Sequence, residues 1–147
     1  MTLRLSGPPR GLAMARLDRA LLARRTRSAL RAAGQARAEL SLALVDDLVM
    51  AELNERHRDE RGPTDVLSFS LVEGAHSEFR GVLLGDVVID VEQAARQARR
   101  ARHSLDDELA RLMIHGVLHL LGHDHEEDGE ARRMRAEERR LWRTVRA

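Results

Sequence analysis

The sequence contains no cysteine, no lysine and no tyrosine, and it has only one tryptophan and two phenylalanines among its 147 residues. The absence of cysteine excludes disulfides and thiolate metal ligands, and it suits a reducing compartment. No apolar run approaches the roughly twenty residues of a membrane-spanning helix, and no apolar signal core follows the first methionine. We therefore expect a cytoplasmic protein without a membrane partner.

The charge of the chain is unevenly distributed, although its net value is only +1. All 25 basic residues are arginine, a bias that a GC-rich genome explains better than any physical requirement. Residues 1–38 carry nine arginines against one acid, Asp18, whereas residues 39–147 carry sixteen arginines against twenty-three acids. The basic segment is compatible with a polyanion partner and equally with an ordinary solvated helix face.

The hydrophobic periodicity and the breakers predict one α+β domain over residues 1–147, with a small, mostly mixed four-stranded sheet and about five helices. Asp90 and Ser104 are expected to cap helices, and Gly34 to end one. We expect strands over 1–5, 39–45, 66–71 and 82–89, and helices over 12–33, 46–57 and 90–102, from 104 onward and from about 128 onward.

A cluster of histidines in residues 115–125 (H-G-V-L-H-L-L-G-H-D-H) gives the strongest chemical signal. His115 and His119 stand four residues apart, so on a helix they share one face. Gly122 can take the left-handed conformation that ends a helix and turn His125 back towards them. Three neutral nitrogens with one open position describe a catalytic zinc site. The alternative is ordinary histidines at a helix end, but four of the seven histidines fall within these eleven residues.

The same spacing occurs in the metzincin peptidases, whose motif reads H-E-x-x-H-x-x-G-x-x-H. Their general base is the glutamate after the first histidine, and this chain has Gly116 at that position. Since glycine can neither take nor give a proton, the shared spacing indicates a shared metal geometry and not a shared substrate. A small zinc metallopeptidase is the first alternative function.

These residues resemble the YbeY family of bacterial zinc-dependent endoribonucleases, whose signature is approximately H-G-x-L-H-L-x-G-y-D-H, with His123 here at the frequent tyrosine position. Two further stretches agree, namely Leu53-Asn54 with Arg58 ahead of residues 63–69, and residues 84–86. The resemblance runs from about residue 39 to residue 126. The loop 59–62 reads D-E-R-G and departs from the family's R-G-K-D-K pattern.

The resemblance implies a single-strand-favouring endoribonuclease that acts in maturation of the 3′ end of 16S ribosomal RNA and in ribosome quality control. It implies that His115, His119 and His125 bind one Zn²⁺ and that Arg58 is important for activity. The implied partners are RNA, and not DNA, together with the ribosome and small-subunit assembly proteins. A non-catalytic ribosome-assembly factor with a structural zinc is the second alternative.

Further side chains are candidates for the site on chemical grounds. Arg58 is a guanidinium fork suited to a phosphate. Asp124 can orient a ligand or simply end the helix turn, and His123 can line the pocket or lie in solvent. Asp86 either faces the site from a strand or serves a strand bulge. Three arginines of the basic segment are expected to bind RNA phosphates: Arg24, Arg25 and Arg27.

Overall fold

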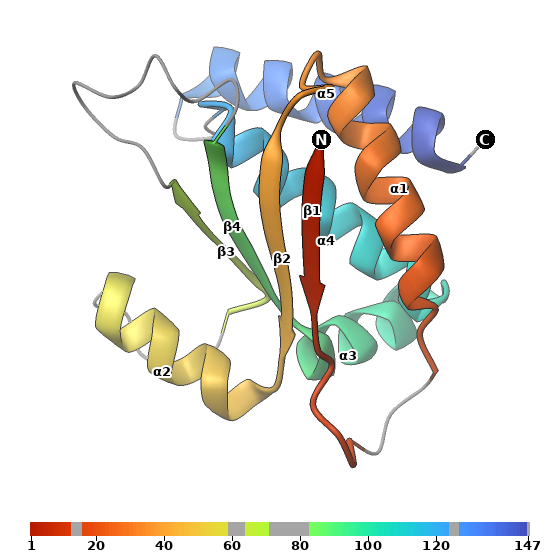
Figure 1. Ribbon diagram of the computed structural model, residues 1–147, viewed down its shortest axis with the longest axis vertical. Coiled ribbons are helices and arrows are strands. Elements are labelled where there is room, and N and C mark those ends of the chain that lie inside the picture. The colour runs from red at the N-terminus through yellow and green to blue at the C-terminus, as the bar shows by residue number, and fades with distance from the viewer. Residues whose placement is uncertain (13–15, 59–63, 71–82, 124–126, 147) are drawn as a thin grey trace.

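Four strands form one mixed sheet in the computed structural model (Figure 1). In spatial order they are β1 (Thr2–Ser6), β2 (Glu39–Val45), β4 (Leu83–Asp90) and β3 (Val66–Ser70). The pairs β1–β2 and β2–β4 are parallel, whereas β3 is antiparallel to β4 and forms an edge. The structure describes residues 1–12, 16–58, 64–70, 83–123 and 127–146.

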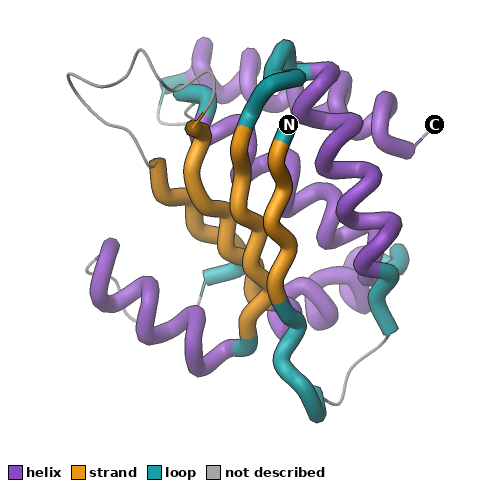
Figure 2. The backbone as a smooth tube through the Cα atoms, viewed as in Figure 1, coloured by secondary structure: helices purple, strands orange, loops and turns teal. Residues whose placement is uncertain are grey.

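The helices cover the two faces of the sheet unequally (Figures 1 and 2). The five helices of the described residues are α1 (Arg19–Ala32), α2 (Asp47–Arg58), α3 (Val91–Ala101), α4 (Leu105–Leu120) and α5 (Asp128–Arg146). The main core lies on the face covered by α4, with α1 and α5 packed on α4. On the opposite face, α2 places Met50 against Leu67 and Val88 in a smaller cluster.

The predicted α+β class, the mixed four-stranded sheet and the five helices are confirmed. The predicted start of the first helix at residue 12 is wrong, because α1 begins at Arg19. Asp18 caps this helix by accepting a hydrogen bond from the Leu21 amide, and its own amide donates to the Asp106 carboxylate at 2.8 Å. The hydrogen bond from Asp18 to Asp106 of α4 helps to fix where α1 starts, and the helix propensity of the local sequence does not predict it. No helix among the described residues is long and apolar enough to cross a membrane.

Gly116 lets α4 approach the sheet unusually closely. A Cβ atom added at Gly116 would lie 2.6 Å from Val87 Cγ1 and 3.2 Å from Ser68 Oγ. The Ser68 hydroxyl donates a hydrogen bond of 2.9 Å to the Gly116 carbonyl, which ties β3 to the C-terminal half of the helix. The glycine that replaces the peptidase glutamate therefore faces the sheet, and no larger side chain fits there without a shift of the helix.

We expect Gly116→Ala to lower the free energy of unfolding, because the added methyl overlaps Val87 in a close-packed core. Overpacking of this kind costs about 1–3 kcal/mol. The matched control is Gly129→Ala, also in a helix, where the nearest atom to an added Cβ is the end of Arg133 at 3.8 Å. That control should be neutral or stabilising by up to about 1 kcal/mol, since alanine is the better helix former. Equal effects of the two substitutions in chemical denaturation would contradict the close contact.

Candidate metal centre

His115 and His119 lie side by side on the last two turns of α4. Their Nε2 atoms are 3.0 Å apart, and their ring centroids are 4.5 Å apart with the planes inclined at 73°. Both side chains are half-buried, so the two nitrogens are shielded by the helices and still reachable. The four-residue spacing thus brings both imidazoles to one point, as the sequence predicts.

The pair is spaced for a shared metal ion. Two nitrogens at zinc–nitrogen distances of about 2.0–2.1 Å in tetrahedral geometry lie about 3.3 Å from each other. The 3.0 Å between the two Nε2 atoms is within a few tenths of an ångström of that value. The donor set is neutral imidazole, which zinc and several other transition metals accept. The residues present therefore fit a divalent ion.

The end of α4 turns the chain at Gly122, as predicted. The Gly122 amide donates to the His119 carbonyl and the His123 amide to the Leu118 carbonyl, both at 3.0 Å. With a φ of 94° at Gly122 this is a Schellman ending, in which a left-handed residue reverses the chain. His123 follows the reversal half-buried, and it lines a pocket of about 260 Å³ with Glu130 of α5.

Two predicted site residues in this stretch, Asp124 and His125, lie outside the described residues. The role of His125 as third ligand stays a prediction, as does the orienting role of Asp124.

Glu138 of α5 is a neighbour of the pair that sequence reasoning missed. Its Oε2 atom lies 3.7 Å from His115 Nδ1, on the ring side away from the shared point. The preceding acid, Glu137, is instead bound by Arg140, whose hydrogen bonds lower the pKa of the Glu137 carboxyl. Carboxylates on the far nitrogen of a ligating histidine fix the ring and its tautomer. The sequence gives one indication of this contact, namely the two acids Glu137 and Glu138 within an arginine-rich segment.

Asp86 points away from the histidine pair. The neighbouring Val87 contacts Gly116 of α4, and successive side chains of a strand alternate between the faces. Asp86 accordingly lies on the α2 face, in register with Phe69 of β3. The strand places it with the smaller core cluster and not beside His115 or His119.

Arg58 is the last residue of α2, and its side chain lies outside the described residues. The preceding His57 stacks edge-to-face on Phe69, with ring centroids 5.0 Å apart. The end of α2 therefore lies over β3 on the face opposite α4. Since β3 is the edge strand, the route from Arg58 to the histidines runs around that edge and not through the sheet.

The three arginines predicted to bind RNA have different surroundings on α1. Arg24 and Arg27 are exposed. The Arg25 side chain is only 13% exposed, and it donates to Asp107 at 3.1 Å and to the Asp106 carbonyl at 3.3 Å. Arg25 thus joins α1 to the start of α4, and the two outward-facing arginines are better placed to meet a polyanion.

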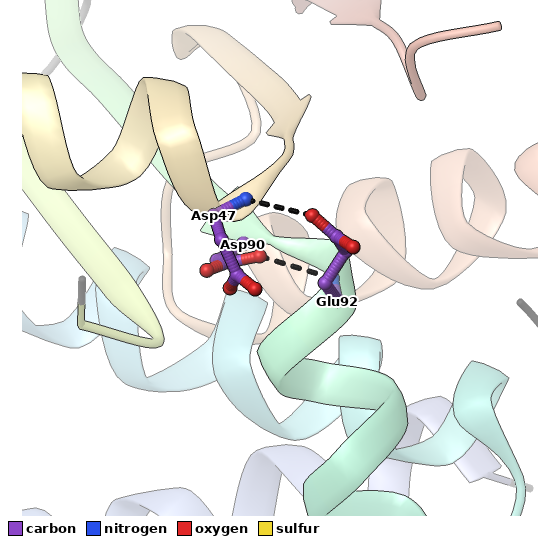
Figure 3. A group of neighbouring side chains, drawn as sticks. All are labelled: Asp47, Asp90 and Glu92. Atoms are coloured by element: carbon purple, nitrogen blue, oxygen red, sulfur yellow. Dashed lines mark hydrogen bonds between the residues drawn. The ribbon is translucent and has the colours of Figure 1, made fainter. Parts of the chain in front are cut away.

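A second cluster of acids joins α2 to α3 (Figure 3). Oxygens of Asp47, Asp90 and Glu92 lie within 4.8 Å of one another, which is a spacing that a metal ion can bridge. Both Asp47 oxygens accept from Arg96, at 2.7 and 3.1 Å, and Glu92 accepts from the Asp47 amide. Asp90 caps α3 by accepting from the Glu92 and Gln93 amides. These contacts account for the cluster as a junction between helices.

The carboxyl group with the most strongly shifted pKa in this junction is that of Asp90. Its side chain is fully buried, and Oδ2 has no hydrogen-bond partner among the described residues. Burial, followed by the neighbouring Asp47, raises the pKa of the Asp90 carboxyl to about 7, whereas Arg96 holds the pKa of Asp47 below its ordinary value. A proton on Asp90 removes the cost of a buried charge beside another carboxylate.

Paired histidines on a helix packed against a mixed sheet are typical of metal-dependent hydrolases. The chain matches the family model described as Endoribonuclease YbeY over residues 15–146. An endoribonuclease YbeY from Anaeromyxobacter sp. (strain Fw109-5) is 47% identical over 144 residues, or 97% of this chain and 71% of that protein. One from Salinispora tropica is 49% identical over 122 residues, or 75% and 78% of the two chains.

A solved structure agrees with these relatives. The solution structure of TM1509 from Thermotoga maritima covers 98% of this chain and 89% of its own, with a TM-score of 0.66 and 26% identity. The chain belongs to the YbeY family of endoribonucleases. The resemblance drawn from residues 115–125 is confirmed.

We expect the Asp90→Asn variant to lose part of the pH dependence of folding. Because the pKa of Asp90 is raised from 3.8 to about 7, its contribution to stability is full below pH 3.8 and is lost as pH rises through about 7. Asparagine keeps the oxygen that caps α3 and carries no titrating proton. The free energy of unfolding, measured in urea from pH 4 to 8, should therefore fall less steeply in the variant. Parallel curves for the two proteins would show that Asp90 is ionised throughout.

Proposed function

We propose that this protein is a zinc-dependent endoribonuclease that favours single-stranded RNA. It acts in maturation of the 3′ end of 16S ribosomal RNA and in ribosome quality control, in the cytoplasm. The 3.0 Å separation of the His115 and His119 nitrogens carries this proposal, because it meets the requirement for a shared ion in a chain of the YbeY family. RNA, the ribosome and small-subunit assembly proteins are the proposed partners.

The proposed metal site consists of His115, His119 and His125, which bind one Zn²⁺ and leave one position open. When bound, zinc lowers the pKa of its water towards neutrality and polarises a phosphoryl oxygen. Glu138 lies 3.7 Å from the far nitrogen of His115, where a small side-chain rotation would let it accept from that N–H and orient the ring. A structural zinc normally has four protein ligands, so the open position favours catalysis over the role of a passive assembly factor.

Arg58 is the proposed phosphate clamp. Its guanidinium fork can donate two parallel hydrogen bonds to a phosphodiester and match the charge that grows on it during cleavage. The helices α2 and α4 lie on opposite faces of the sheet, and β3 is its edge strand. The scissile phosphate would therefore bind beside β3, where residues of both helices can contact it. The exposed Arg24 and Arg27 would hold more distant phosphates of the strand.

The peptidase alternative is weakened by the packing of α4. A metzincin needs a carboxylate directly after its first histidine, and that position is Gly116. The space there is filled by Val87, so a base at this position would face the core and not the open metal position.

Alanine at His115, His119 or His125 should remove most of the bound zinc, with little change in the far-ultraviolet circular dichroism. The matched control is His57→Ala, which removes a histidine from the opposite face and should keep one zinc per chain. Because the ligands bind as neutral imidazoles, zinc should also leave the wild type below about pH 6. Equal zinc content in the His125→Ala variant and the wild type, measured by atomic absorption, would rule out the proposed ligand set.

Arg58→Ala should keep its full zinc content and lose RNA cleavage, since an arginine does not ligate zinc. Removing one preorganised donor of this kind lowers the rate about 10²–10³-fold. Arg58→Lys should recover only part of the rate, because a point charge replaces a fork. Arg56→Ala, two residues earlier on the same helix and exposed, serves as the control and should cleave normally. Cleavage by Arg58→Ala at the wild-type rate would remove Arg58 from the site.

A further inference from the structure

A pocket of about 260 Å³ opens between α4 and α5 next to the histidine pair. It is lined by side chains of both helices: Arg111, Ile114, Arg135, Glu138, Arg139 and Trp142. We call it the arginine pocket. Glu138 belongs to its wall and also lies 3.7 Å from His115 Nδ1, so the pocket and the candidate metal centre share a residue.

Three guanidinium groups in this wall form no ion pair with the carboxylates of the described residues. Three arginines elsewhere form ion pairs among the described residues: Arg25 with Asp107, Arg96 with Asp47 and Arg140 with Glu137. Among the described residues, no such ion pair forms at Arg111, Arg135 or Arg139. The one acid among the described lining residues, Glu138, lies against His115 instead. Converging positive charges without a counter-charge create a potential that attracts an anion.

Trp142 supplies a flat apolar surface at the same place. The Arg111 guanidinium carbon lies 4.7 Å from the centre of the indole, and that of Arg25 lies 5.7 Å away. Arg25 is fixed from behind by Asp107, so it supports the ring. Arg111 is exposed and stacks on the ring, where it can turn a donor fork towards a ligand.

We propose that the arginine pocket binds the phosphodiester backbone of an RNA strand next to the cleavage position. This rests on the proposed function and adds a substrate-binding subsite to it. Arg111, Arg135 and Arg139 bind phosphate oxygens, and Arg111 changes its contact with the Trp142 ring as it does so. Positively charged grooves of this kind follow the backbone of a nucleic-acid strand.

The single tryptophan makes a direct test possible. Because the chain has one tryptophan and no tyrosine, its fluorescence excited at 295 nm reports the surroundings of Trp142 alone. The probe is a 2′-O-methylated oligouridylate, added to the zinc-loaded protein, with the length of the RNA checked on a gel after each titration. Binding is followed in parallel by the anisotropy of a dye on the RNA. We expect the tryptophan signal to change and to saturate together with the anisotropy.

The double variant Arg135→Gln/Arg139→Gln should bind the probe about tenfold more weakly or worse, and lose about 0.7 in the salt slope for each phosphate contact. Arg99→Gln/Arg100→Gln is the matched control, because it removes two exposed arginines from α3, outside the pocket. It should bind nearly as the wild type does. Urea unfolding of each variant checks that the fold persists.

The proposal is overturned if anisotropy saturates while the tryptophan signal stays constant, or if the two double variants have equal affinities and salt slopes. Failure of the proposed function gives a different pattern. In that case the wild type leaves unmodified RNA intact, with or without zinc, whatever the titrations show. If the wild type cleaves RNA but the fluorescence of Trp142 does not change on binding, the proposed function stands and the proposed subsite is refuted.

Discussion

The close contact between α4 and the sheet at Gly116 determines where the candidate chemistry lies. Without a side chain at this position the helix lies directly on Val87, and the Ser68 hydroxyl ties its backbone to the edge strand. His115 and His119 then lie on the side of the helix next to Gly116, with His115 near Glu138 of α5. The glycine thus sets the depth of the helix that carries both imidazoles. A larger residue would move the histidines relative to Glu138, because close-packed cores transmit displacements.

The arginines of this chain, which has no lysine, have two different roles. Some guanidinium groups hold elements together, as at Arg25 between α1 and α4 and at Arg96 between α3 and α2. Others line the arginine pocket beside the histidine pair, where none of them forms an ion pair with the described residues. The net charge of +1 conceals this division. In the proposed function, affinity for RNA would depend on this local surplus of positive charge and not on the total.

Local signals were enough to predict most of the fold and the closeness of His115 to His119. The alternation of apolar and polar residues predicted β2. Asp90 and Ser104, which cap α3 and α4 through hydrogen bonds, predicted where these two helices start. The histidine spacing and Gly122 specified the end of α4. What the sequence did not reveal depends on contacts between distant segments. Glu138 meets His115 only because α5 packs on α4, and the start of α1 depends on Asp106.

The proposed function requires that the histidine pair of α4 belong to a zinc site that cleaves RNA. The most direct measurement incubates the purified protein with an unstructured RNA before zinc is stripped, after stripping, and after one equivalent is restored. We expect internal cleavage that disappears with the metal and returns in proportion to the zinc rebound. Cleavage that continues undiminished in protein shown to hold no metal would contradict it.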